Sequence, residues 1–201
     1  IFQSNKIPEI RLKSGSSAKM SMKKESGWFK RGVGIERSSA IIDSSPELIL
    51  AYLSDLNSNE RLKIHKEENH CARLKFDEVG NESISAIVKL VPWPLFPREF
   101  VAKTIWWKDE ASGIFYYAFF SVPYKGGVDY GFTKKSIVGT VRGIYTLEPL
   151  EEVMMPNGGR ILQCRMEFIQ VVDAAGMIPA FVVNSKLPES LSPVDEAAVL
   201  F

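Results

Sequence analysis

Alternating apolar and polar side chains predict β-strands through most of the middle of the chain, over residues 71–173. In the clearest segments every second side chain is apolar, which is the period of a strand with one buried face. Others are rich in β-branched and aromatic residues, as strands commonly are. The predicted strands are 84–90, 100–107, 114–122, 141–147 and 162–168. Consecutive strands with mostly short connections favour an antiparallel sheet.

Two helices are expected beside these strands. The first follows a shorter β segment at 28–42 and starts at Ser-Ser-Pro-Glu, residues 44–47, where a serine cap precedes an early proline and Glu47 lies three residues after Ser44. Its apolar side chains recur every four residues, so one face packs on a core and the helix ends near 57–59. The second is a short apolar helix at 177–184 with a proline in its first turn.

This order of elements, with strands between an early and a closing helix, is typical of the α+β class. A strongly curved sheet wrapped around a terminal helix encloses an apolar space between them. Such a space is where small molecules usually bind.

The composition is that of an ordinary globular protein, with 201 residues, 45% hydrophobic and 24% charged. A net charge of +1 gives no overall electrostatic argument for binding nucleic acid. The charge is uneven, however, since residues 1–37 hold nine basic and three acidic side chains. We interpret 1–27 as a basic, flexible leader or linker and 28–201 as one domain. The leader is either a solvated linker or an arm that contacts anionic lipid headgroups.

Candidate catalytic and metal-binding residues are scarce. We predict that the protein has no catalytic site and binds no metal ion or cofactor. His65 and His70 lack the spacing that places two imidazoles on one helical face. Cys71 and Cys164 lie far apart without a CxxC pattern, which favours reduced thiols, with one long-range disulfide as the alternative. The longest conspicuous apolar stretch, 114–122, is half the length of a membrane-spanning helix.

Three segments carry a resemblance to a known family. They are Val-Pro-Trp-Pro-Leu-Phe-Pro-Arg-Glu-Phe-Val at 91–101, Val-Arg-Gly-Ile-Tyr-Thr-Leu-Glu-Pro-Leu at 141–150, and 172–184 with its Asp-x-x-Gly-x-Ile-Pro. In order and spacing they resemble START domains, the lipid-transfer modules related to steroidogenic acute regulatory protein. The resemblance covers about 28–191. It implies a helix-grip fold, a curved antiparallel sheet around a C-terminal helix, with an internal hydrophobic tunnel for one lipid-like ligand.

Alternation then predicts which side chains face this tunnel. Glu99 and Lys103 mark the outer face of their strand, so its uncharged alternate residues point inward. The same pattern places Leu162 inward with the even-numbered residues that follow it, and a tyrosine offers a polar anchor in an apolar wall. The candidate ligand-binding residues are Phe100, Ala102, Thr104, Trp106, Tyr117, Cys164, Met166, Phe168, Ile178, Phe181 and Val182.

One departure from the family pattern bears on the ligand. Sterol- and phospholipid-binding relatives commonly project a buried arginine into the tunnel at the position held here by Thr104, opposite an acidic partner. The facing region here holds Ser85 and Ala86, so both charges are absent. A neutral tunnel favours a ligand with little headgroup, or one anchored by hydroxyl and phenol hydrogen bonds.

We therefore expect a non-enzymatic lipid-binding domain that carries or senses one hydrophobic molecule. The expected partners are a lipid or other hydrophobic small molecule, an anionic membrane surface in transient contact, and other domains of a longer protein, since the chain starts at Ile1 without methionine. The expected location is the cytoplasm, in part peripheral at membranes. The alternatives are a cyclase-type or hydrolase-type enzyme on the same scaffold, and a regulatory or protein-interaction module.

Overall fold

The computed structural model describes residues 19–23, 33–56, 58–59, 61–63, 70–91, 94–123, 136–176, 178, 182 and 191–201. Its strands are β1 Lys19–Lys23, β2 Val33–Ile42, β3 His70–Val79, β4 Glu82–Lys89, β5 Arg98–Lys108, β6 Phe115–Ser121, β7 Ile137–Val138, β8 Thr140–Pro149, β9 Val153–Met154, β10 Arg160–Ile161 and β11 Cys164–Asp173. Its helices are α1 Pro46–Ser54 and α4 Ser192–Leu200.

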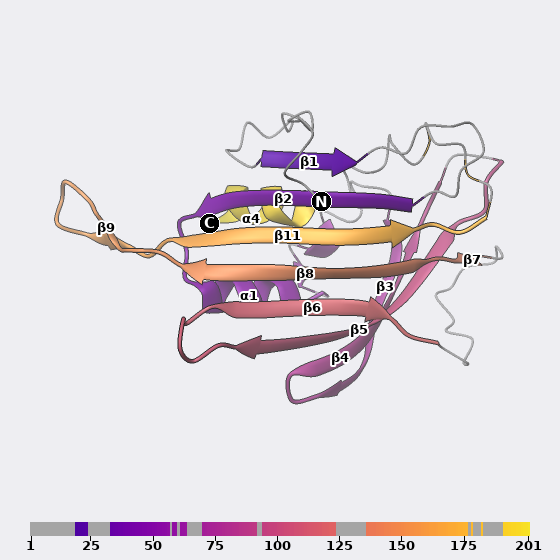
Figure 1. The fold of residues 1–201 in the computed structure, drawn as a ribbon, viewed down its shortest axis with the longest axis horizontal. Helices are drawn as coiled ribbons and strands as arrows, with labels where there is room; N and C mark the ends of the chain where they lie inside the picture. Colours follow the sequence, from indigo (N-terminus) through magenta and orange to yellow (C-terminus); the bar gives the residue numbers. More distant parts are fainter. Residues whose placement is uncertain are drawn as a thin grey trace.

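The described strands form one large sheet and a small separate hairpin. The large sheet runs β1-β2-β11-β8-β6-β5-β4-β3, with every neighbouring pair antiparallel, and β7 pairs in parallel with β5. Both α1 and α4 lie on the same face of this sheet (Figure 1). The predicted α+β class is confirmed, and so is the curved antiparallel sheet with a C-terminal helix against its inner face.

The long predicted strands are present as β4, β5, β6, β8 and β11. One boundary is wrong: β11 begins at Cys164, and Leu162 is 49% exposed instead of inward. The preceding β9–β10 hairpin, which projects beyond the sheet in Figure 1, explains the difference. Its turn is closed by a 2.8 Å bond from the Met155 amide to the Gly159 carbonyl, so the chain reaches the sheet only after Leu162.

The first helix begins one residue later than its predicted cap. Ser45, not Ser44, is the N-cap, and its hydroxyl accepts a hydrogen bond from the Leu48 amide at 3.3 Å. Leu48 is exposed, while Ile49 and Leu53 are buried in the core. The helix also ends at Ser54, earlier than expected.

The C-terminal region holds a helix that the sequence pattern did not predict. Most of the expected closing helix at 177–184 falls outside the described residues, although Ile178 and Val182 are described and both are buried. Beyond it, α4 starts with a proline in its first turn and packs Val194 and Ala197 into the core. Two small or medium apolar residues make a weak stripe, which is why periodicity did not indicate this helix.

Part of the predicted leader belongs to the sheet. Strand β1 pairs with β2 from Lys19 opposite Ser39 to Lys23 opposite Ile35. The remaining residues of 1–27 lie outside the described part of the chain. The domain boundary predicted at 27 stays a prediction.

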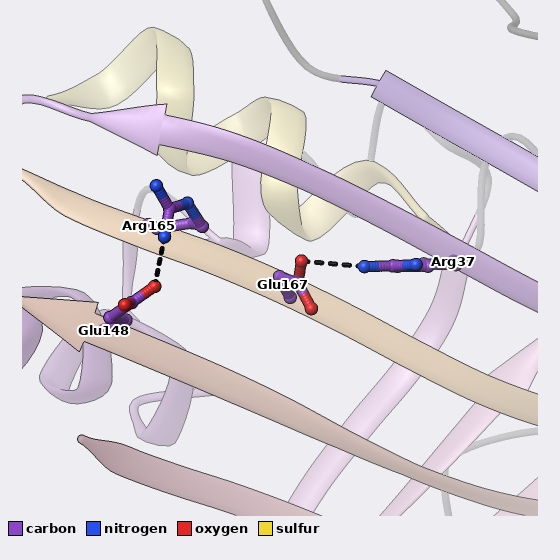
Figure 2. Close-up of polar contacts among 4 residues, drawn as sticks. All are labelled: Arg37, Glu148, Arg165 and Glu167. Carbon is purple, nitrogen blue, oxygen red and sulfur yellow. Dashed lines mark hydrogen bonds and ion pairs between the residues drawn. The ribbon is translucent and has the colours of Figure 1, made fainter. Parts of the chain in front are cut away.

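The outer face of β2, β11 and β8 carries pairs of opposite charge (Figure 2). Arg37 on β2 donates to Glu167 on β11 at 2.8 Å, and Arg165 on β11 donates to Glu148 on β8. Arg165 and Glu167 alternate with the even-numbered residues of β11 that were predicted to point inward, and their side chains lie on the outer face. Because these side chains are a third or more exposed, each pair stabilises the fold by about 0–1 kcal/mol.

The hydrophobic core lies between the inner face of the sheet and the two helices. Its fully buried side chains come from β2, α1, β8, β11 and α4, and the largest are Phe168, Ile42, Ile49, Leu53, Leu147, Met166 and Leu191. None of the helices among the described residues is both long and apolar enough to cross a membrane.

Candidate functional site

The inner face of the sheet also borders a cavity of about 160 Å³. All the central strands contribute alternate residues to its wall, and α1, the segment after α1 and the first turn of α4 close it from the helical side. The lining side chains are Leu53, Leu56, Arg61, Ser85, Ile87, Lys89, Phe100, Ala102, Thr104, Tyr117, Phe119, Val141, Tyr145, Phe168, Gln170, Val172 and Pro193.

Strand β5 supplies three of the predicted residues to this wall. Phe100, Ala102 and Thr104 all line the cavity, because a strand points alternate side chains to one face. On the opposite face, Lys103 forms an ion pair with Glu82 at 2.6 Å. The charge pattern of this strand therefore predicted its orientation correctly.

An aromatic group forms one side of the cavity. The rings of Tyr145 and Phe168 stack with centroids 4.0 Å apart and planes at 4°. Phe119 contacts both at about 6 Å, and Tyr117 lies 5.8 Å from Tyr145. Tyr117 and Phe168 were predicted to face the cavity, and both do.

The other predicted residues lie elsewhere. Cys164 and Met166 are fully buried in the core at the start of β11, where the helices cover the sheet, and the cavity begins only at Phe168. Trp106 packs against the same core. Ile178 and Val182 are buried without lining the cavity, and Phe181 lies outside the described residues. Ligand contact by any of the eleven candidates remains a prediction.

The residue opposite Thr104 differs from the one expected. Thr104 pairs with Ser83, and their hydroxyl oxygens are 2.6 Å apart. The Thr104 hydroxyl also donates to the Ser83 carbonyl at 3.3 Å. Neither side chain is charged, so this position has no buried ion pair, as the sequence indicated.

The expectation of an uncharged cavity is nevertheless wrong. Arg61 and Lys89 both line it, and Arg61 is only 3% exposed. The Arg61 guanidinium lies over the ring of Tyr52, 4.9 Å from its centroid. Its Nε and Nη1 atoms have no hydrogen-bond partner among the described residues. Sequence reasoning missed Arg61 because it follows the predicted helix in a polar segment without periodicity.

A buried carboxylate lies on the inner face of β2. Glu36 is fully buried, and its Oε2 atom accepts a 2.7 Å hydrogen bond from Nε2 of Gln170. Gln170 lines the cavity, whereas Glu36 does not. No pattern in the sequence indicates this inward placement, because the outer face of β2 carries Ile35 and Ile41.

The Pro-Arg-Glu-Phe segment that supported the family resemblance has a structural role here. Arg98 is buried and its Nε donates to the Ala174 carbonyl, just beyond β11, at 2.7 Å. Glu99 accepts from the Ser136 hydroxyl at 2.7 Å. At Gly139 an added Cβ would lie 2.5 Å from the Phe100 ring, so only glycine fits there. The motif therefore holds the first residues of β5 in place where Phe100 enters the cavity wall.

Cys164 is a buried core thiol without a disulfide. Burial, with smaller contributions from Glu148 and Glu47, raises the pKa of this thiol to about 12. Since the thiolate is the reactive form, Cys164 is a poor nucleophile at neutral pH. Within the described part of the chain, no group of three or more His, Cys, Asp or Glu side chains is placed to hold a metal ion.

We predict that Cys164 in the folded protein reacts with iodoacetamide at pH 8 about a thousand-fold more slowly than an unperturbed thiol, because few thiolates form four pH units below the pKa. Peptide mapping by mass spectrometry measures the rate at Cys164 separately from Cys71. In urea the difference should disappear. Rapid labelling of Cys164 in the folded state would contradict its assignment to the core.

Comparison with known proteins supports the fold. No protein-family model matches the chain, and no curated protein matches it significantly. A STAR-related lipid transfer protein from Xanthomonas axonopodis aligns with a TM-score of 0.66 and 14% identity, over 98% of each chain. The human StarD13 (DLC2) lipid transfer and protein localization domain gives 0.63 and 15%, over 97% of this chain and 89% of that one.

Human STARD10 aligns with a TM-score of 0.62 and 13% identity, over 97% of this chain and 74% of that one. At such low identity these alignments show a shared fold and do not identify a ligand. They agree with the arrangement of an antiparallel sheet and a C-terminal helix. The chain thus has a START-like, helix-grip fold.

Proposed function

We propose that this protein binds a single hydrophobic, lipid-like molecule in the cavity and performs no reaction on it. The observation that carries the proposal is the cavity wall, which is largely aromatic and aliphatic and is assembled from five strands and two helices around a space shielded by the sheet. Burying apolar ligand surface there contributes about 25 cal/mol per Å². The lipid transfer proteins with the same fold support this class of ligand.

The size of the cavity constrains how a ligand enters. About 160 Å³ is smaller than the roughly 300–1,000 Å³ of sites that hold drug-sized molecules. A sterol or a long acyl chain therefore requires the wall to open further. We propose that the segments 178–184 and 123–139 shift to admit it, and Pro193 of α4 also borders the space.

Delivery to a membrane is a second part of the proposal. Residues 1–37 carry nine basic and three acidic side chains, which suits transient contact with an anionic cytoplasmic surface. Within a longer protein, the same binding event would serve to sense a ligand instead of transporting it.

The enzyme alternative rests on a buried acid near the cavity. Glu36 is the described candidate, but it is hydrogen-bonded to Gln170 and is absent from the cavity wall. A general base must reach the proton it removes within about 2.6–3.2 Å or through one water. We therefore favour binding without catalysis.

Transfer between vesicles tests the proposal. Donor vesicles containing dehydroergosterol or pyrene-labelled phosphatidylcholine are mixed with the protein, which is then reisolated and analysed for bound fluorophore. We expect one probe to copurify at a stoichiometry that saturates near one, and to move to acceptor vesicles faster than it does without protein. If neither probe binds at any protein concentration, the proposal that the cavity admits a sterol or a phospholipid is wrong.

A further inference from the structure

Arg61 is a buried cation that faces the cavity and has no ion-pair partner among the described residues. It is 97% buried, since 3% of its surface is exposed, and its side chain lines the cavity wall. Arg37, Lys103, Arg160 and Arg165 each form an ion pair with a glutamate, and Arg61 does not take part in any of these pairs. Its Nε and Nη1 atoms find no acceptor among the described residues.

A buried guanidinium is unfavourable unless hydrogen-bond acceptors or a negative charge compensate it. Arginine does not lose its proton in proteins, so Arg61 cannot become neutral on burial. Burying a charged group whose N–H groups lack acceptors is costly, because nothing then replaces the water that the ion has lost. The cation–π contact with the Tyr52 ring, at 4.9 Å from its centroid, compensates only in part, because it leaves Nε and Nη1 without an acceptor among the described residues.

The surroundings of Arg61 hold the guanidinium in place. Its backbone amide donates to the Ser58 hydroxyl at 3.3 Å. The Tyr52 ring beneath it is fixed by a 2.9 Å hydrogen bond from its hydroxyl to Glu196 on α4. The Ser192 hydroxyl also donates to Glu196, at 2.7 Å. Arg61 is therefore a positioned donor at the boundary of an otherwise largely apolar space.

We propose that Arg61 binds an anionic oxyacid group, a carboxylate or phosphate, carried by the apolar ligand of the cavity. The fork of guanidinium N–H groups matches two oxygens of such a group, and charge-assisted hydrogen bonds of this kind are the strong ones. This inference rests on the proposed ligand-binding function and adds a headgroup preference to it. In this protein the buried cation at the cavity is Arg61, in the segment after α1. The β5 position where sterol- and phospholipid-binding relatives commonly carry an arginine is occupied by the uncharged Thr104.

A set of probes with the same chain and different headgroups tests this preference. Binding of dodecanoate, dodecyl phosphate, dodecanol and dodecylamine is measured by isothermal titration, with inorganic phosphate added as an arm without a chain. We expect the two anionic probes to bind roughly 10- to 100-fold more tightly than dodecanol, as charged hydrogen bonds of about 1.5–3 kcal/mol imply. Dodecylamine and phosphate alone should bind most weakly.

Arg61→Met removes the charge and keeps most of the side-chain length. The variant should lose the preference for anionic probes while its dodecanol affinity stays within about threefold of the wild type, because the apolar contacts are unchanged. Arg61→Lys should retain part of the preference. Arg37→Met is the matched control, because Arg37 lies on the outer face of β2, and it should bind all probes like the wild type.

The outcomes separate this inference from the proposed function. Equal wild-type affinity for dodecanoate, dodecyl phosphate and dodecanol would overturn the role of Arg61 and leave apolar binding intact. The wild-type comparison decides this even where Arg61→Met folds poorly. Failure of dodecanol and both anionic probes to bind would overturn the proposed function and this inference together. Tight binding of inorganic phosphate alone would contradict a chain-bearing ligand.

Discussion

Ala102→Phe should weaken binding of an apolar probe such as dodecanol at least about tenfold, which corresponds to 1.4 kcal/mol. Ala102 lies on β5 between Phe100 and Thr104, and all three side chains line the cavity. A phenyl ring at this position occupies much of a space of about 160 Å³. Isothermal titration against the same probe measures the loss. Because the added ring fills existing space, the melting temperature should change little.

A matched control uses the neighbouring position. Lys103 is on the opposite face of the same strand and pairs with Glu82 at 2.6 Å. Lys103→Phe introduces the same ring outside the cavity, so affinity for the probe should be preserved. If both variants lose the same amount of affinity for the probe, the substitutions disturb β5 in general. If both variants keep their affinity, the ligand does not enter this cavity.

Phe168→Ala should destabilise the protein by about 3–5 kcal/mol, the usual cost of removing a buried phenyl group. Phe168 is 1% exposed and stacks on Tyr145 at 4.0 Å. For a domain of this size the melting temperature should fall by about 6–20 °C. Thermal and urea unfolding followed by circular dichroism give the change in free energy of unfolding.

Phe120→Ala is the comparison for this loss. Phe120 is 45% exposed, so the same truncation should change stability by less than about 0.5 kcal/mol. A small effect at Phe168 would mean that the stacked pair does not belong to a tightly packed core.

The sequence predicted the sheet well where charge marks the outer face of a strand. On β5, Glu99 and Lys103 identify the outer face without ambiguity. Three of the four residues predicted to point inward on this strand line the cavity. Alternation on β11 was equally correct about the buried face. It could not tell that Cys164 and Met166 lie under the helices while Phe168 reaches the cavity, because that division depends on where α1 and α4 pack.

Periodicity was misleading where both faces of a strand mix polar and apolar residues. On β4 the cavity face holds Ser85, Ile87 and Lys89, while Ala86 and Val88 are buried on the other side. On β2 the inner face includes Glu36, and Ile41 on the outer face is 50% exposed. Burial of these polar groups is decided by partners distant in the sequence, such as Gln170 for Glu36.

Arg61 shows the same limit for the candidate site. Its local sequence is polar and follows the end of α1, so nothing in the pattern distinguishes it from a surface arginine. Only the three-dimensional packing places its guanidinium over Tyr52 and beside the cavity. The headgroup preference of the ligand was therefore not predictable from the alternation of the strands.

Native mass spectrometry of the purified protein after incubation with a total cellular lipid extract tests whether the cavity holds one lipid-like molecule. We expect a 1:1 adduct whose released ligand is a small apolar molecule with a single carboxylate or phosphate group, and expect Ala102→Phe to reduce the fraction of adduct. A spectrum that contains the unliganded protein alone, at lipid concentrations that saturate other lipid-binding proteins, would contradict the proposed binding function.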